Sequence, residues 1–77
     1  MEIRYSKQAS KFLQKQSKQV QLRIIKAINK LPAGDVKKMQ GMNYYRLRVG
    51  DFRVIFSNDG TVLMVEKIGN RGEVYKD

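Results

Sequence analysis

Residues 45–49 alternate between apolar and polar side chains, and a glycine turn and a second strand-like run, 52–56, follow them; this is the strongest constraint on the fold. In Tyr45-Arg46-Leu47-Arg48-Val49, every second side chain is apolar, which is the period of a half-buried β-strand. Gly50-Asp51 then predicts a tight reversal into a second strand, Phe52 to Phe56. Two such strands form an antiparallel pair with one face against a core.

The alternation assigns the side chains of this pair to two faces. One face, which other elements must cover, receives Tyr45, Leu47, Val49, Phe52, Val54 and Phe56. The opposite face receives Arg46, Arg48 and Arg53, with Tyr44 and Ile55 among them, and its only expected carboxylate is Asp51 at the turn. Guanidinium groups bind phosphate bidentately and exposed rings stack on unpaired bases, so we interpret this face as a nucleic-acid surface. The alternative is a solvated outer face on which arginine only aids solubility.

Two helical patterns precede the alternating run. Ser6 is a predicted N-cap for a helix from Lys7 to about Gln16, and Ser17 for a second helix that Pro32 and Gly34 end. The second helix carries one apolar stripe, formed by Val20, Ile24, Ala27, Ile28 and Leu31. Leu22 lies off this stripe and Ile25 at its edge. The short break between the helices predicts a helical hairpin.

The remaining segments complete an α+β fold with the order β-α-α-β-β-β. Predicted extended segments are 2–5, 61–68 and 73–75, the turn 58–60 predicts a hairpin, and 32–42 and 69–72 are predicted to be irregular. The two-helix hairpin is then expected to pack on an antiparallel β-meander. Seventy-seven residues predict one domain, 1–77.

Charge and composition narrow the chemistry. Sixteen Lys and Arg against seven Asp and Glu give a net charge of +9, which favours a polyanionic partner. The chain has no Cys or His, so a metal site would have to rest on carboxylates alone, and we expect none. No apolar run reaches the ~20 residues that span a bilayer, and the N-terminus has no apolar signal segment, so a cytoplasmic protein without a membrane partner is expected.

Two runs of the sequence resemble the RelE-type toxins of the RelE/ParE superfamily. In residues 45–56, as in that family, two basic residues spaced by one precede a glycine turn and an aromatic-Arg-hydrophobic strand. The ending Ile68-Gly69-Asn70-Arg71-Gly72-Glu73-Val74-Tyr75 resembles the family's Gly-x-Arg…Glu-Val-Tyr, and Met39-Gln40-Gly41 resembles its lead-in. The resemblance covers nearly the whole chain and implies one RelE-like domain.

The resemblance implies a toxin of a type II toxin–antitoxin system that cuts mRNA in the ribosomal A site, without a metal or other cofactor. The 2′-hydroxyl would attack the adjacent phosphate. The implied catalytic residues begin with Arg46 and Arg48, which would bind the phosphate. Arg53 matches the arginine of the next strand in the family and Arg71 its loop arginine, and Tyr75 would be the general base. From the sequence itself we predict that the RNA-binding residues are Lys37, Lys38, Tyr44, Arg46 and Arg48. Fixed cations aimed at the phosphate would stabilise the transition state, and four arginines would favour the phenolate form of Tyr75.

Two other functions fit the same sequence. A ParE-like toxin shares the fold but inhibits DNA gyrase, and a non-catalytic nucleic-acid-binding module would explain the charge but give Tyr75 no role. For either toxin, the resemblance implies a cognate acidic antitoxin that folds on binding, with contacts that include Leu22, Ile25 and the arginine face. For the RelE-like function, it also implies the ribosome and its A-site mRNA as partners.

Overall fold

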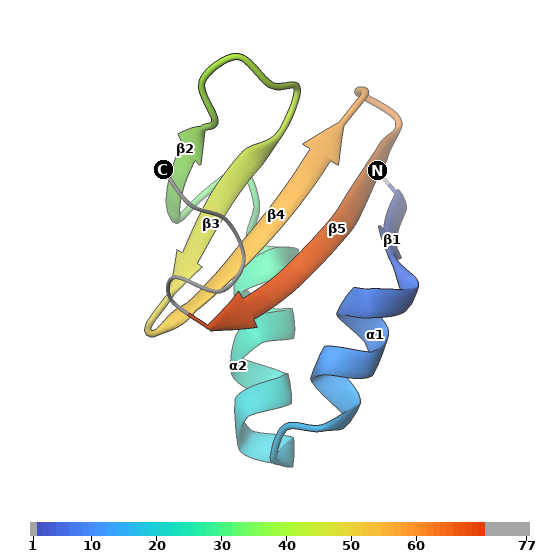
Figure 1. Ribbon diagram of the computed structural model, residues 1–77, viewed down its shortest axis with the longest axis vertical. Helices are drawn as coiled ribbons and strands as arrows, with labels where there is room; N and C mark the ends of the chain where they lie inside the picture. The colour runs from blue at the N-terminus through green and yellow to red at the C-terminus, as the bar shows by residue number, and fades with distance from the viewer. Residues whose placement is uncertain (1, 71–77) are drawn as a thin grey trace.

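Two helices and five strands follow one another along the chain, in a computed structural model that describes residues 2–70 (Figure 1). Their order is β1 (Glu2–Tyr5), α1 (Lys7–Gln14), α2 (Lys18–Asn29), β2 (Asp35–Lys38), β3 (Tyr45–Val49), β4 (Phe52–Asn58) and β5 (Val62–Asn70). The strands form one sheet in the order β1-β5-β4-β3-β2, in which β1 runs parallel to β5 and the other neighbours are antiparallel. The predicted α+β architecture, a helical hairpin on a meander, is confirmed. None of the helices within residues 2–70 is long and apolar enough to cross a membrane.

The two predicted N-caps start the two helices. The hydroxyl of Ser6 accepts a hydrogen bond from the Ala9 N–H at 3.1 Å, and that of Ser17 accepts one from Val20 at 3.2 Å. Each bond satisfies a backbone donor that the first helical turn leaves free. α1 ends at Gln14, two residues before the predicted end, because the chain must leave the helix to reach the extended conformation of the Ser17 cap.

The core lies between the two helices and one face of the sheet. Both helices lie on the same side, α1 against β5 and β1 and α2 against β3 (Figure 1). The predicted stripe of α2 faces this core: Ile24 and Ile28 are fully buried, and the other stripe residues pack partly buried around them. Leu22 lies off the stripe and is 58% exposed, whereas Ile25 packs against the core.

The predicted apolar face of the β3–β4 pair is the face that the helices cover. Leu47, Val49, Val54 and Phe56 are buried there, and Tyr45 and Phe52 are half-buried against the same core. The rings of Phe12 and Phe52 meet edge to face at 5.9 Å, which ties α1 to the start of β4. The alternation in the sequence therefore predicted correctly which face of the β3–β4 pair the helices cover.

β2 corrects the prediction that residues 32–42 are irregular. Residues Asp35–Lys38 form an edge strand that pairs with all but one residue of β3. Val36 is its one apolar residue, and it lies opposite Leu47 on the core side. One apolar residue among four gives no readable period, and the strand owes its conformation to the neighbour with which it pairs.

The β4–β5 hairpin turns where Asn58-Asp59-Gly60 predicted it. The Asp59 carboxylate accepts hydrogen bonds from the N–H groups of Val62 and Thr61, at 2.7 and 2.8 Å. These bonds favour the ionised form and hold the pKa of Asp59 below its usual value. After the turn, β5 continues to Asn70, two residues beyond the predicted strand end at Ile68.

Candidate functional site

The outer face of the sheet, which is the face away from the helices, brings three arginines together. Arg48 on β3 lies directly opposite Arg53 on β4, and Arg46 lies opposite Ile55 two pairs further along. Residues directly opposite in a sheet share a face, so the predicted grouping of these arginines is confirmed. β2 adds Lys37, which lies opposite Arg46. We call Arg46, Arg48 and Arg53 the arginine cluster.

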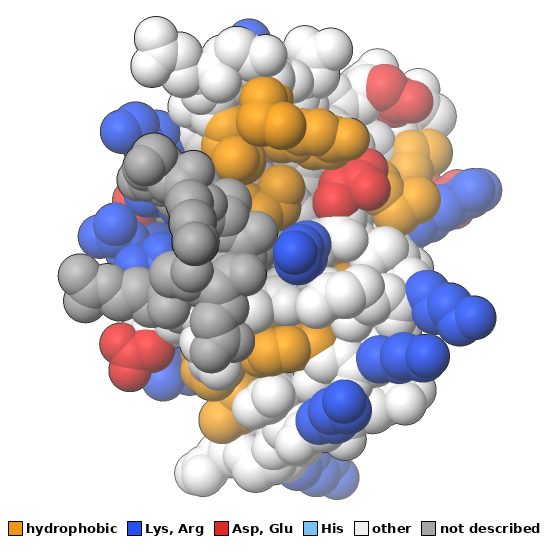
Figure 2. All heavy atoms as spheres, viewed as in Figure 1, with side chains coloured by type: hydrophobic (Ala, Val, Ile, Leu, Met, Phe, Trp, Pro, Cys, Tyr) orange, Lys and Arg blue, Asp and Glu red, His pale blue; other side chains and the backbone are white. Residues whose placement is uncertain are grey.

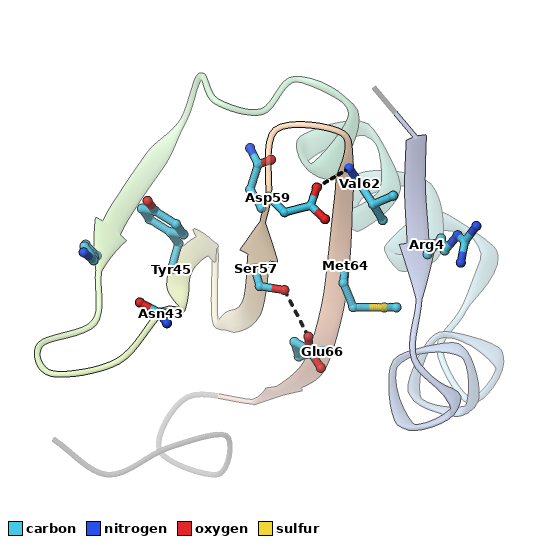
Figure 3. A pocket seen from close by; sticks show the side chains of 10 residues that line it. Arg4, Asn43, Tyr45, Ser57, Asp59, Val62, Met64 and Glu66 are labelled. Carbon is cyan, nitrogen blue, oxygen red and sulfur yellow. Dashed lines mark hydrogen bonds between the residues drawn. The ribbon is translucent and has the colours of Figure 1, made fainter.

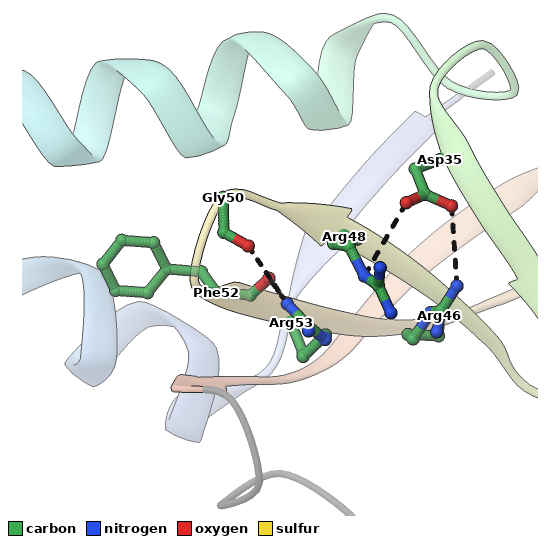
Figure 4. Close-up of polar contacts among 6 residues, drawn as sticks. All are labelled: Asp35, Arg46, Arg48, Gly50, Phe52 and Arg53. Atoms are coloured by element: carbon green, nitrogen blue, oxygen red, sulfur yellow. Dashed lines mark hydrogen bonds and ion pairs between the residues drawn. The ribbon is translucent and has the colours of Figure 1, made fainter.

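The cluster contains a carboxylate that the sequence interpretation did not place there. Asp35 at the start of β2 lies opposite Arg48, and Figure 4 shows its carboxylate between the guanidinium groups of Arg46 and Arg48. Its Oδ1 is 3.5 Å from Nη2 of Arg46, and its Oδ2 is 3.7 Å from Nε of Arg48. The expectation that only Asp51 could bring a carboxylate to this face is therefore wrong, because it did not include β2.

Arg46 has an unmatched donor. Its side chain is only 11% exposed, and its buried Nε has no hydrogen-bond partner among the described residues. A buried N–H without an acceptor is uncommon in folded proteins and unfavourable. The guanidinium therefore has binding capacity that Asp35 does not use.

Arg53 is fixed in a different way. It is 8% exposed, and its Nη1 donates to the carbonyl oxygens of Gly50 and Phe52, each at 3.1 Å (Figure 4). These bonds hold the guanidinium against the β3–β4 turn.

Gly50 has a φ of +59°, and a Cβ there would come within 2.6 Å of Nη2 of Arg23. Arg23 of α2 is thus a further cation beside this turn, and no signal in the sequence linked it to the site.

The predicted RNA-binding residues divide between two places. Lys37 extends the arginine cluster, whereas Lys38 lies opposite Tyr45 and lines a separate hollow. Tyr44 is half-buried and directly precedes β3, where its carbonyl oxygen accepts a bond from the Met39 N–H at 2.9 Å. The structure thus places Lys37 with the arginines and Lys38 apart from them.

The hollow has a volume of about 610 Å³ and opens beside the β4–β5 hairpin (Figure 3). Its lining residues are Arg4, Lys38, Asn43, Tyr45, Ser57, Asn58, Asp59, Val62, Met64 and Glu66. The Ser57 hydroxyl donates to the Glu66 carboxylate at 3.1 Å. Two carboxylates among the lining residues make this hollow less suited to a phosphate than the arginine cluster.

Two predicted catalytic residues, Arg71 and Tyr75, lie outside the described residues, so their assignment stays a prediction. Within residues 2–70, no three His, Cys, Asp or Glu side chains gather as a candidate metal site.

The comparison with known families covers almost the whole chain. The family model described as the ParE toxin of the type II toxin–antitoxin system parDE matches residues 3–75. No curated protein sequence matches the chain.

Several solved structures have the same fold. The RelE–RelB complex of the archaeon Pyrococcus horikoshii OT3 contains a chain 28% identical to this one, with a TM-score of 0.76, and the match covers 94% of this chain and 96% of that one. The intact RelBE toxin–antitoxin complex of E. coli gives 20% identity, a TM-score of 0.68 and coverage of 94% and 98%. The RelBE2 toxin–antitoxin complex of Mycobacterium tuberculosis gives 15% identity, a TM-score of 0.72, and coverage of 94% of this chain and 92% of that one. At the identities of these last two, the similarity shows the fold alone.

Proposed function

The chain belongs to the ParE toxin family of type II toxin–antitoxin systems, within the RelE/ParE superfamily. From this premise we propose that it is a ribosome-dependent, metal-independent mRNA endonuclease. The observation that carries the proposal is the arginine cluster, in which two paired strands hold three guanidinium groups on one face. Cations fixed on a rigid sheet stabilise charge that develops on a phosphate, because they need no reorganisation during the reaction.

The proposed reaction uses the nucleotide's own 2′-hydroxyl. Its oxygen loses its proton and attacks the adjacent phosphorus, the bond from phosphorus to O5′ breaks, and O5′ takes up a proton from water. The products are a 2′,3′-cyclic phosphate and a 5′-hydroxyl. Negative charge grows on the phosphorus oxygens as the new bond forms. Arg46 and Arg48 would face these oxygens and bind them more tightly in the transition state than in the ground state.

Arg53 has a narrower role in this proposal than its sequence position implied. Its Nη1 is already engaged by two carbonyl oxygens of the β3–β4 turn, so it cannot offer its full fork to a phosphate while those bonds last. We assign it to adding positive charge and to holding the turn that spaces Arg48 from β4. Tyr75 would accept the proton of the 2′-hydroxyl, and Arg71 would add a further positive charge.

The ribosome would supply what the toxin lacks. Attack by a 2′-hydroxyl requires it to lie in line with the leaving O5′, and such orientation can account for a large part of a rate enhancement. The arginine cluster offers charge to the phosphate but no set of groups that would fix the sugar. We therefore expect free RNA to be cut poorly and ribosome-bound message to be cut well.

An acidic antitoxin is the expected protein partner. The solved relatives are toxins in complex with RelB or an antitoxin. A chain with a net charge of +9 would attract an acidic partner, and the exposed Leu22 of α2 offers an apolar contact of the kind that such a partner can cover. Ile25 would contribute little, because it already packs against the core.

Inhibition of DNA gyrase is the second candidate, and one observation favours it. The family model that matches residues 3–75 is named for ParE toxins. In that case the arginine cluster would bind a protein or DNA surface and would have no catalytic role.

Primer extension on a translated message distinguishes the two candidates. We expect codon-spaced breaks when ribosomes are present, few breaks on the same RNA without ribosomes, and normal gyrase supercoiling in a parallel assay. Arg71→Ala and Tyr75→Phe should abolish the breaks. Inhibited supercoiling with an intact message would contradict the endonuclease proposal and support the gyrase candidate.

A further inference from the structure

Asp35 occupies a special position in the arginine cluster. It stands on the edge strand β2, and each of its two carboxylate oxygens faces a different arginine of β3. The carboxylate thus bridges Arg46 and Arg48 as two non-bridging oxygens of a phosphate would (Figure 4). Asp35 therefore lies where the proposed substrate group would bind.

The bridge is loose. Its two distances, 3.5 and 3.7 Å, exceed the length of about 2.7–2.9 Å that is typical of charge-assisted hydrogen bonds. The side chain of Asp35 is 56% exposed, so water screens its attraction to both arginines. An ion pair of this kind holds its partners in place weakly enough to be exchanged for a better acceptor.

Arg46 also shows that the bridge leaves donors unused. Asp35 meets this guanidinium through Nη2, while Nε is buried without a partner among the described residues. Arginine matches an oxyanion best when two of its N–H groups bind in parallel. A small movement of the side chain would let a phosphate use both edges of the fork, which Asp35 at its present distance does not.

We propose that Asp35 is the internal counter-ion of the Arg46–Arg48 pair, and that it gives way when a phosphate group binds there. The inference rests on the proposed function, because it takes this pair as the phosphate site. In the free protein, Asp35 keeps the two guanidinium groups directed toward one point and partly neutralises them. An incoming anion must displace the carboxylate, so anions that bind weakly are poor competitors for the site.

Titration with inorganic phosphate, followed by NMR at the Nε–H resonances of Arg46 and Arg48, tests the inference without any cleavage. Asp35→Asn keeps the shape of the side chain but removes its charge. Since two ion pairs to an exposed carboxylate are lost, we expect this variant to bind phosphate roughly three- to tenfold more tightly than the wild type. Asp35→Glu should stay close to the wild type, because the charge is restored.

Asp51→Asn is the matched control. It removes the same charge from the turn beside the cluster, and it should change phosphate affinity by less than about twofold if proximity to the arginine pair matters more than net charge. Equal affinities in Asp35→Asn and the wild type would overturn the inference, and so would equal gains in the Asp35 and Asp51 variants. If phosphate shifts neither arginine in any variant, the inference also fails, whereas the proposed function is decided separately by cleavage on ribosomes.

Discussion

Two regions of this molecule are strongly basic, and they carry their charge in different ways. The helices present exposed cations that are mostly lysines: Lys7, Lys11, Lys15, Lys18, Arg23, Lys26 and Lys30. No carboxylate occurs anywhere in residues 3–34. On the outer sheet face, Arg46 and Arg53 are largely buried and Arg48 is 47% exposed, and each is held by a carboxylate or by backbone carbonyls. Over α1, at lower right in Figure 2, the basic side chains stand apart from one another.

The two kinds of basic side chain suit different tasks, namely attracting an anionic partner over a distance and acting on defined atoms at contact. Exposed lysines on flexible stems create a long-range field that guides an anionic partner, and salt screens this field. Arginines that are held in place on a sheet act only at contact, but they act on defined atoms. Under the proposed function, we therefore expect the helices to steer the anionic partner and the sheet to act on the phosphate.

The helices carry this charge at a cost to their own stability. Lys7 and Lys18 are the first residues of α1 and α2, and neither helix has an acidic residue in its first turn. A cation at this end opposes the helix dipole, where an anion would be favourable. Lysine at both positions is easier to explain by an anionic partner than by folding.

The largest expected effect is on catalysis by the sheet region. Arg46→Gln should lower the rate of message cleavage by roughly 10²–10³-fold, since it removes a donor aimed at the developing charge. Lys26→Gln, which removes one charge from α2, should change the rate by less than about threefold. Single-turnover cleavage on purified ribosomes measures both, and equal losses would show that only net charge matters.

Arg53 tests whether the sheet region also depends on its arginines for folding. Arg53→Leu should lower the free energy of unfolding by about 1–3 kcal/mol, because the carbonyl oxygens of Gly50 and Phe52 lose their donor. Chemical denaturation measures this loss. An unchanged stability would mean that water replaces the guanidinium without cost.

The helix region should affect association more than stability. Replacing Lys11, Lys15, Lys18 and Lys26 together by Gln should weaken ribosome binding by roughly tenfold at low salt and flatten the dependence of affinity on salt. The free energy of unfolding should fall slightly, because Lys11, Lys15 and Lys26 lie at helix C-termini where a cation favours the dipole, and only Lys18 opposes it. Binding measured at two salt concentrations checks the prediction, and a salt dependence as steep as that of the wild type would contradict it.

Asp59, in the β4–β5 turn, is expected to have the smallest effect. Its carboxylate stabilises the turn and lies outside both basic regions. Because its pKa is lowered by the N–H groups of Val62 and Thr61, its ionised form stabilises the fold at pH values above the unfolded-state pKa. That contribution should disappear as the pH falls through the folded-state pKa. Asp59→Asn should therefore be less stable than the wild type at pH 6, and the difference should narrow toward pH 3 in denaturation experiments.

The sequence was sufficient where local pattern and tertiary packing agree. The alternation from Tyr45 to Phe56 placed three arginines on one face, because the period of a strand fixes which side each residue faces. Ser6 and Ser17 marked the helix starts for a similar reason, since a hydroxyl before a helical pattern satisfies the same backbone donors in most proteins.

The partners of these arginines could not be predicted. β2 has one apolar residue, so its pairing with β3, and with it the position of Asp35, depends on tertiary structure. The contact of Arg53 with Gly50 likewise follows from the geometry of one turn. A sequence pattern can assign a charged residue to a face, but which group meets that charge depends on neighbours distant in the chain.

The division between the two regions is tested most directly by single-turnover cleavage of ribosome-bound message over a range of toxin concentrations. We predict that Arg48→Gln lowers the maximal rate with little change in the concentration for half-maximal rate. The fourfold lysine variant should instead raise that concentration and leave the maximal rate close to the wild-type value. If the lysine variant loses the maximal rate, or if Arg48→Gln changes only the half-maximal concentration, the assignment of steering to the helices and chemistry to the sheet is wrong.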